Sequence, residues 1–406
     1  MNVVFLTMSR FAGIANRGIY TDLMRKFRDE GHNVYIVAPH ERSMGKPTEL
    51  METDGAHILG VKTLNLQKSS VIEKGVGQVL VESQYKRAIK NYFKGIKFDL
   101  ILYSTPPITF PKVIKYLKRS NPQAKTYLLL KDIFPQNAVD IGMMSKSGVK
   151  GMLYNYFRKK EKNLYKLSDF IGCMSPANVQ YLLKHNPEIT ADRVEVAPNS
   201  VELKVESLES VGSGELKAKV RNKYGLPTDK PVFIYGGNLG KPQGIPFLIQ
   251  CMDDNANRHD CHFLIIGSGT EQSRMKAWYD EKRPQSVTIM DVLPKNDYDE
   301  LVNACDVGLI FLDHRFTIPN YPSRLLPYLE NKMPIIAATD PNCDTGSIAE
   351  KNGYGYWCES NSVENFTNAV DKMLNSDIKA MGANGYKFLC ENYLVQNTYN
   401  AIIRHL

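Results

Sequence analysis

The chain has 406 residues, of which 43% are hydrophobic and 23% are charged, with a formal net charge of +8. These values are typical of folded globular proteins and exclude a disordered chain or a fibre. The length favours two domains, each large enough to bury a core.

The charge is unevenly spread along the chain. Residues 1–200 hold 30 Lys and Arg against 17 Asp and Glu, a balance of +13. Residues 201–406 hold 21 against 26, a balance of −5. The basic half is expected to face an anionic partner, such as a membrane, a nucleic acid or a phosphorylated substrate, unless its charge serves solubility alone.

Targeting and metal signals are weak. Met1–Arg10 has no basic leader and no cleavage site, and no apolar run approaches the 18–20 residues or so of a membrane span, so we expect neither a signal peptide nor a transmembrane helix. The seven cysteines are scattered without a CxxC pair, which favours reduced thiols in the cytoplasm. His259–His262 is the one dense ligand-like cluster, and it lacks partners at metal spacing, so no metal is expected.

Short apolar or β-branched runs alternate with segments of helical periodicity along the whole chain. Such alternation predicts the α/β class, with parallel, doubly wound sheets covered by helices on both faces. The predicted strands are 2–7, 33–38, 100–104, 126–130, 170–174, 194–197, 231–235, 262–266, 287–290, 307–311, 334–338 and 355–357. Helical periodicity is clear, for example, over Tyr20–Glu30 and Tyr298–Ala304.

A polar stretch interrupts this pattern between about Glu202 and Asp229. We therefore place the first domain at 1–200 and the second at 201–385, with a C-terminal helix over about 386–406 packing back on the first. In such sheets ligands bind at the carboxyl ends of the strands.

The loop after the first strand, Ser9–Gly18, precedes a predicted helix. Its backbone amides, with Gly13 allowing close approach, are suited to hold a phosphate. It does not match GxGxxG, and a plain strand–helix turn remains an equal alternative.

Asp132 follows the buried strand that ends near Leu130. A carboxylate there can contact a sugar hydroxyl or accept a proton. The alternative is an Asp that caps the following turn.

The segment Met143–Asp169 reads as a basic amphipathic helix with aromatic anchors. It suits contact with an anionic leaflet. The alternative is a solvated face over a core stripe that includes Val149, Leu153, Phe157 and Leu164. The basic residues assigned to the surface are Lys146, Lys150, Arg158, Lys159 and Lys162.

Two further segments read as anion sites in the second half. Tyr235–Gly244 contains Gly237 and Lys241 before a helix start, and Pro322-Ser323-Arg324 begins another helix with Ser323 as cap or first-turn residue. Free amides, the lysine and the guanidinium can together hold a diphosphate, with the helix dipole contributing. The alternatives are a structural turn and simple capping with a solvent-facing arginine.

Taken in order, these pieces resemble the retaining glycosyltransferases of family 4, which have the GT-B fold. The resemblance covers nearly the whole chain, and the segment Lys131–Gly142 is similar to the DLWPE segment of bacterial transferases that build O-antigen and capsule repeat units. The supporting motifs are 31–34, 175–176, 194–201, 237–244, 267–269, 304–307 and 322–334.

This resemblance implies two Rossmann-like domains facing across a deep cleft. It implies a nucleotide-diphosphate sugar donor on the C-terminal domain, an acceptor on the N-terminal domain, and transfer without metal or other cofactor. The implied catalytic residues are Asp132, Lys241 and Arg324, and the implied donor-binding residues are Gly13, Asn16, Gly237, Asn238, Gly269, Leu293 and Ser323.

The chain departs from the family pattern at two places. The pair of glutamates spaced by seven residues falls on Pro319 and Pro327, and the Arg and Lys of the phosphate loop fall on Asn238 and Gln243. We therefore expect Lys241 to take over neutralisation of the phosphates.

The resulting hypothesis is a cytoplasmic hexosyltransferase, peripheral on the inner face of the plasma membrane. It moves a sugar, from a UDP donor, to a lipid-linked saccharide acceptor during bacterial surface polysaccharide assembly, and it does not bind nucleic acid. The alternatives are a UDP-sugar 2-epimerase of the same architecture and a non-catalytic protein that binds anionic surfaces.

Overall fold

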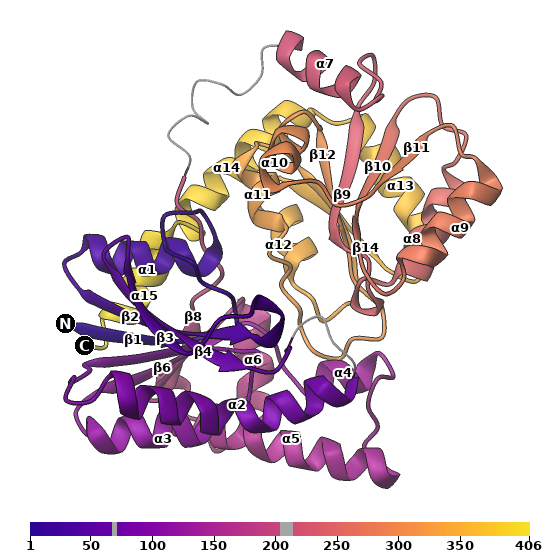
Figure 1. Ribbon diagram of the computed structural model, residues 1–406. Coiled ribbons are helices and arrows are strands. Elements are labelled where there is room, and N and C mark those ends of the chain that lie inside the picture. The colour runs from indigo at the N-terminus through magenta and orange to yellow at the C-terminus, as the bar shows by residue number, and fades with distance from the viewer. Residues whose placement is uncertain (67–70, 204–213) are drawn as a thin grey trace. The chain divides into compact units, whose positions relative to one another are not determined.

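Two sheets organise residues 1–66, 71–203 and 214–406, which are the residues that the computed structural model describes (Figure 1). The chain divides into a first unit, Met1–Glu202 with Leu394–Leu406, and a second unit, Leu203–Tyr393. The predicted C-terminal helix over about 386–406 is two helices in the structure. The first of these, α14 (Ile378–Asn392), belongs to the second unit and α15 (Val395–Ile403) to the first.

The sheet of the first unit has the strand order β3-β4-β2-β1-β5-β6-β7-β8. Every pair is parallel except β3 with β4. The strands are β1 Asn2–Leu6, β2 Asn33–Glu41, β3 Glu49–Thr53, β4 Ala56–Thr63, β5 Leu100–Ser104, β6 Lys125–Leu130, β7 Phe170–Cys173 and β8 Val194–Val196. The helices of this unit, besides α15, are α1 Ile19–Asp29, α2 Val71–Tyr92, α3 Pro111–Ser120, α4 Gln136–Asp140, α5 Gly148–Leu167 and α6 Pro176–His185.

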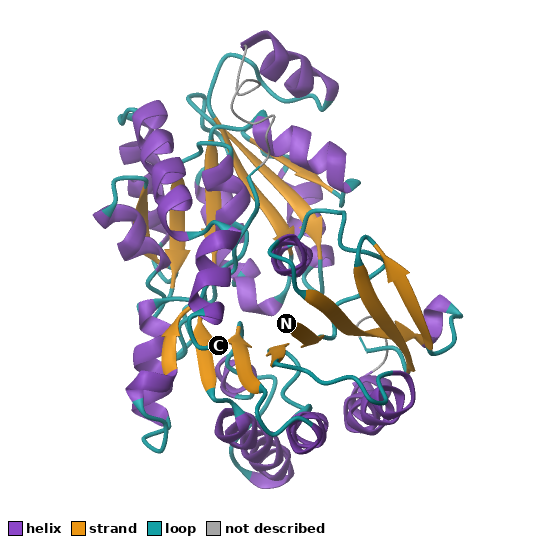
Figure 2. Cartoon of the chain, turned by 90° about the vertical axis from the view of Figure 1, so that its left-hand side faces the viewer, coloured by secondary structure: helices purple, strands orange, loops and turns teal. Residues whose placement is uncertain are grey.

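Both faces of this sheet are buried, as the near-continuous apolar strands predict. Side chains alternate along a strand, so Val4 and Leu6 of β1 enter one hydrophobic cluster while Val3 and Phe5 enter another. Helices lie on both sides of the strands (Figure 2).

The hairpin β3–β4 is absent from the sequence-based assignment. Its turn, Asp54-Gly55, has positive φ at both residues, 53° and 74°. An Asp-Gly pair is a strong signal for a hairpin turn, and it was available in the sequence.

The sheet of the second unit has the order β11-β10-β9-β12-β13-β14 and is parallel throughout. Its strands are β9 Val232–Asn238, β10 His262–Ser268, β11 Val287–Met290, β12 Val307–Phe311, β13 Ile335–Thr339 and β14 Gly355–Glu359. The helices are α7 Gly214–Lys223, α8 Ile245–Asp254, α9 Gln272–Lys282, α10 Lys295–Asn303, α11 Leu325–Glu330, α12 Thr345–Lys351, α13 Val363–Leu374 and α14.

The twelve predicted strands are all present, and the predicted α/β class with two Rossmann-like sheets is confirmed. The facing of two domains across a cleft stays a prediction. Among the described residues, no helix is both long and apolar enough to span a bilayer.

Helix α15 completes the first unit from the far end of the chain. Leu394 bridges to Val201, and the Thr398 hydroxyl donates to the Pro198 carbonyl at 3.1 Å. The Tyr399 ring lies 5.0 Å from that of Phe27 in α1. The last residues of the sequence therefore belong to the core built by the first.

A buried ionic cluster fixes the start of α1. Arg25 donates to Asp22 at 2.7 Å and to Glu202 at 2.6 Å, and Asp22 is only 1% exposed. Asp22 also accepts the amides of Gly18 and Glu202. The cluster ties the β1–α1 loop to the residue at which the first unit ends.

Replacing Arg25 should therefore destabilise the first unit. Arg25→Ala leaves the Asp22 carboxylate buried without its cation, and we expect the free energy of unfolding to fall by about 3 kcal/mol. Urea unfolding followed by circular dichroism measures this. Arg87→Ala, at an exposed arginine of α2, is the matched control. Equal midpoints for the two variants would contradict the proposed importance of the cluster.

Candidate functional site

The carboxyl ends of β9 and β10 form the core of the site in the second unit. The two strands are in parallel register, with Gly237 beside Gly267 and Asn238 beside Ser268. The Leu239 amide donates to the Ser268 carbonyl at 2.8 Å. A Cβ on Gly269 would lie 2.3 Å from the Leu239 oxygen, so the two loops touch.

Arg324 lies under this double turn. A Cβ on Gly237 would lie 3.5 Å from Arg324 Nη2, and Gly237 has φ of 132°, a conformation that favours glycine. The Arg324 guanidinium lies over the Tyr235 ring, 4.4 Å from its centroid. Stacking on the ring fixes the plane of the guanidinium.

Arg324 Nη1 is buried and has no hydrogen-bond partner among the described residues. Buried donors are nearly always paired in folded proteins, and an unpaired one needs an explanation. A guanidinium held in place with a spare donor is suited to bind an anion such as a phosphate.

The two uncharged residues of the phosphate loop bind each other. Asn238 Nδ2 donates to Gln243 Oε1 at 2.9 Å. Lys241, which opens the 3₁₀ turn Lys241–Gln243, is exposed, and no ion pair found in the described parts of the chain includes it. Lys241 is thus the available cation of this loop.

The predicted helix start at Ser323 is wrong by two residues. Helix α11 begins at Leu325, its N-cap residue is Arg324, and no side chain caps it. Ser323 is exposed in the preceding turn. The turn before the helix is closed by the Leu325 amide, which donates to the Pro322 carbonyl at 3.2 Å.

The two prolines at the positions of the family's glutamates are part of the packed structure. Pro319 is buried, and Pro327 is the third residue of α11, where a missing amide costs little. Neither offers a ligand for a sugar. Leu293, one of the implied donor-binding residues, is half-buried just after β11.

The Ser9–Gly18 loop of the first unit already holds a carboxylate. Asp54 Oδ2 accepts the amides of Ile14 and Ala15 at 2.9 and 3.0 Å. A Cβ on Gly13 would lie 2.4 Å from that oxygen, so Gly13 leaves room for Asp54. The prediction that these amides hold a phosphate is therefore wrong for Ile14 and Ala15, while Asn16 lies exposed beside them.

Asp132 is half-buried just past β6. The Thr105 hydroxyl oxygen accepts the amides of Lys131 and Asp132 at 3.0 and 3.2 Å, and Asn137 donates to Asp132 Oδ1 at 2.8 Å. Burial raises the pKa of Asp132 to about 6, against the opposing effect of the bonds from the Ile133 amide and Asn137. Burial also lowers the pKa of the neighbouring Lys131 to about 7.

Helix α5 carries an exposed apolar face in its first turns. The exposed fractions are 84% for Val149, 74% for Met152, 49% for Leu153 and 42% for Tyr156. The spacing of these residues places them on one side of the helix. The alternative that Val149 and Leu153 are core residues is therefore wrong, whereas Leu164 is fully buried.

The basic residues of this segment differ in their exposure and in their ion pairs. Lys146 and Lys159 are exposed, and Lys146 Nζ lies 5.5 Å from the centroid of the Tyr154 ring. Arg158 does not fit a surface role, because Glu161 Oε2 and Asn186 Oδ1 bind it at 2.5 and 2.7 Å. Lys162 is exposed and 3.5 Å from Glu188, and the side chain of Lys150 lies outside the described residues.

Sequence reasoning missed a buried carboxyl in the second unit. Asp340 follows β13 and accepts the amides of Asn342 and Cys343 at 2.9 and 3.1 Å, while its Oδ2 has no partner among the described residues. Burial raises the pKa of Asp340 to about 7. Its place directly after an apolar strand was the available signal.

The described residues contain no group of three or more His, Cys, Asp and Glu arranged to hold a metal ion. The His259–His262 cluster is built as an ordinary strand start. His262 Nε2 lies 2.8 Å from the Thr288 hydroxyl, and burial lowers the pKa of His262 to about 4.

Several known proteins are similar to this chain. Residues 217–388 match the family model described as glycosyl transferases group 1. The probable glycosyltransferase WbjE of Pseudomonas aeruginosa is 22% identical over 324 residues, covering 78% of this chain and 75% of that protein. The putative colanic acid biosynthesis glycosyl transferase WcaI of Escherichia coli K12 is 23% identical over 185 residues, covering 46% and 43%.

Among solved structures, Anabaena Alr3699/HepE in complex with UDP superposes with a TM-score of 0.67, at 13% identity, over 100% of this chain and 99% of that one. This likeness extends over both units and concerns the fold. Residues 217–388 of the second unit are thus similar to the glycosyl transferases group 1 family, and the protein is a glycosyltransferase whose two sheets have the GT-B fold.

Proposed function

We propose that the protein transfers a sugar, with retention of configuration, from a UDP-sugar to a lipid-linked saccharide at a membrane surface. The observation that carries the proposal is Arg324, whose buried Nη1 lacks a partner beside the glycines that end β9. Binding of UDP by Anabaena HepE, which shares the fold, supports a UDP donor.

In this proposal the second unit holds the diphosphate. Arg324 supplies a fixed guanidinium, Lys241 a mobile ammonium, and Gly237 allows a phosphate to approach the backbone. As the sugar leaves, negative charge grows on the diphosphate, and cations placed in advance stabilise it most in the transition state. With two cations available, the proposed reaction needs no metal.

Asp132 is proposed to stabilise the donor sugar. An oxocarbenium-like sugar carries positive charge, and a carboxylate close to it lowers the barrier. This role is inferred from the family resemblance of residues 131–142. The hydrogen bond from Asn137 to the carboxylate, and those from the Lys131 and Asp132 amides to the Thr105 hydroxyl oxygen, hold Asp132 in one orientation.

The acceptor is proposed to be a lipid-linked saccharide at the inner face of the plasma membrane. The exposed apolar side of α5 with Lys146 and Lys159 supports this, since apolar insertion and attraction to anionic lipids act together. The name of the relative WcaI, a putative colanic acid biosynthesis glycosyl transferase, supports a role in surface polysaccharide assembly, while membership of family 4 rests on the resemblance of the sequence motifs alone.

The donor site is tested by binding of UDP. Arg324→Ala should weaken UDP binding at least tenfold, because it removes charge-assisted hydrogen bonds, and Lys241→Ala should weaken it about threefold. Isothermal titration calorimetry measures both. Lys387→Ala, at an exposed lysine of α14, is the control and should bind as the wild type does. Unchanged affinity in Arg324→Ala would refute the assignment.

The role of Asp132 is tested by the pH dependence of transfer. With a pKa of about 6, Asp132 is protonated below that pH and cannot stabilise positive charge. The rate of transfer should therefore rise between pH 5 and 7, with an apparent pKa near 6. Asp132→Asn should lose this limb together with most of the rate. A variant that keeps the wild-type profile would show that another group titrates.

The membrane surface is tested with vesicles. The double variant Val149→Glu, Met152→Glu removes two apolar contacts and adds two negative charges, so partition onto phosphatidylglycerol vesicles should fall at least tenfold. Co-sedimentation measures it. Leu216→Glu, at an exposed leucine of α7, is the control. Equal sedimentation of the double variant and the wild type would contradict the proposal.

A further inference from the structure

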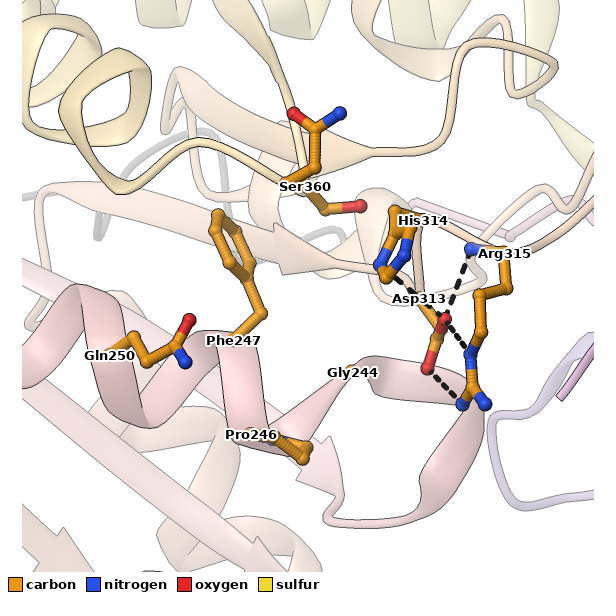
Figure 3. A pocket seen from close by; sticks show the side chains of 9 residues that line it. Gly244, Pro246, Phe247, Gln250, Asp313, His314, Arg315 and Ser360 are labelled. Atoms are coloured by element: carbon orange, nitrogen blue, oxygen red, sulfur yellow. Dashed lines mark hydrogen bonds and ion pairs between the residues drawn. The ribbon is translucent and has the colours of Figure 1, made fainter.

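A cavity of about 560 Å³ lies in the second unit, outside the donor residues named above. The first turns of α8 form one wall, and the loops after β12 and β14 form the others (Figure 3). Its volume falls within the range of about 300–1,000 Å³ that holds small-molecule ligands in proteins. The side chains that matter below are Phe247, Gln250, Asp313, His314, Arg315 and Ser360.

One wall is a rigid ion pair. Arg315 Nε and Nη2 donate to the two oxygens of Asp313 at 2.8 and 2.7 Å, and the Arg315 amide donates to Oδ1 at 3.0 Å. Burial opposes ionisation of Asp313, but the bonds from Arg315 hold its pKa below the ordinary value. The pair stays charged on both sides and contributes no net charge to the cavity.

The facing wall combines an aromatic ring with an amide. Phe247 projects into the space between Gln250 and His314 (Figure 3). Phe247 is 9% exposed, so part of its ring remains open to the cavity. An aromatic ring offers an apolar surface, and the glutamine amide both donates and accepts hydrogen bonds.

Ser360 supplies the observation that points to a ligand. Ser360 is only 1% exposed, and its Oγ has no hydrogen-bond partner among the described residues. The Ser360 amide donates to the Thr339 carbonyl at 2.9 Å, which fixes the residue at the end of β14. A buried hydroxyl without a partner is costly, and one that lines a cavity is ready to bind a polar ligand.

We propose that this cavity is a subsite for a neutral saccharide, separate from the diphosphate site. The apolar face of a pyranose ring packs on Phe247, and its hydroxyls bind Ser360, Gln250 and the edges of the Asp313–Arg315 pair. The lack of net charge on that pair disfavours a phosphate. The inference rests on the proposed function for its source of ligand, which is the saccharide of the acceptor or a free sugar.

Binding of sugars without donor tests the subsite directly. We would use saturation-transfer difference NMR with methyl glycosides of neutral hexoses and N-acetylhexosamines, and expect at least one to bind the wild type. Ser360→Ala and Gln250→Ala should each bind it about threefold to tenfold more weakly, the effect of one lost hydrogen bond. Phe247→Leu, which keeps an apolar side chain and removes the ring, should weaken binding as well.

The melting temperature of Ser360→Ala distinguishes a hydroxyl that binds a ligand from one that is merely unpaired. Ser360→Ala removes an unpaired buried hydroxyl, so its melting temperature should equal or exceed that of the wild type while sugar binding falls. The matched control is Gln285→Ala, at an exposed glutamine of the same unit that does not line the cavity. If Ser360→Ala gains stability and binds sugar as the wild type does, the proposal is overturned.

The source of the sugar and the fate of the two proposals are then distinguishable. If the acceptor occupies the subsite, Gln250→Ala raises KM for the acceptor and leaves UDP affinity unchanged. If a free sugar does, binding of glycosides falls and KM stays constant. If UDP binds the protein and no glycoside does, the subsite alone is overturned. If a glycoside binds and UDP does not bind at all, the donor site alone is overturned. Displacement of the glycoside by UDP would refute the separation of the two sites.

Discussion

The parallel direction of the strands is the constraint on which the candidate sites depend. In the second sheet every strand runs the same way, so all carboxyl ends meet at one edge. The glycines at the carboxyl ends of β9 and β10, the ion pair after β12, the buried Asp340 after β13 and Ser360 after β14 all lie at that edge. The amino ends of the strands carry none of the candidate groups described here. The candidate site residues therefore lie at one edge of the sheet, and the apolar residues of the core lie within its strands.

Strand positions could be predicted because short apolar runs between polar segments are typical of buried strands in parallel sheets. The hairpin β3–β4 escaped because its strands alternate polar and apolar residues less regularly, although Asp54-Gly55 marked its turn. Because the hairpin was missed, the place of Asp54 in the Ser9–Gly18 loop was missed as well. Asp54 fills the loop that Gly13 opens, and a sequence in which the two are some forty residues apart gives no sign of that contact.

The candidate site was predictable where residues are neighbours in the chain. Gly237, Asn238 and Lys241 lie within five residues of one another in the chain, and the resemblance to known transferases singled out Arg324. The pairing of Asn238 with Gln243, the stacking of Arg324 on Tyr235 and the commitment of Arg158 to Glu161 depend on side-chain geometry. The sugar subsite draws on three segments separated by more than forty residues each, so no local pattern announces it.

The return of α15 to the first unit makes that unit discontinuous along the chain. Its hydrophobic core includes Val395, Tyr399 and Ile402 together with Phe27 of α1. These residues follow the second unit in the chain, so during synthesis the first unit cannot complete its core until the entire second unit has been made. A fragment ending at Glu202 would leave the α15 docking surface bare, and the missing helix added in trans as a peptide would be the natural complement. The two halves of this enzyme are separate sheets but a single unit of biosynthesis.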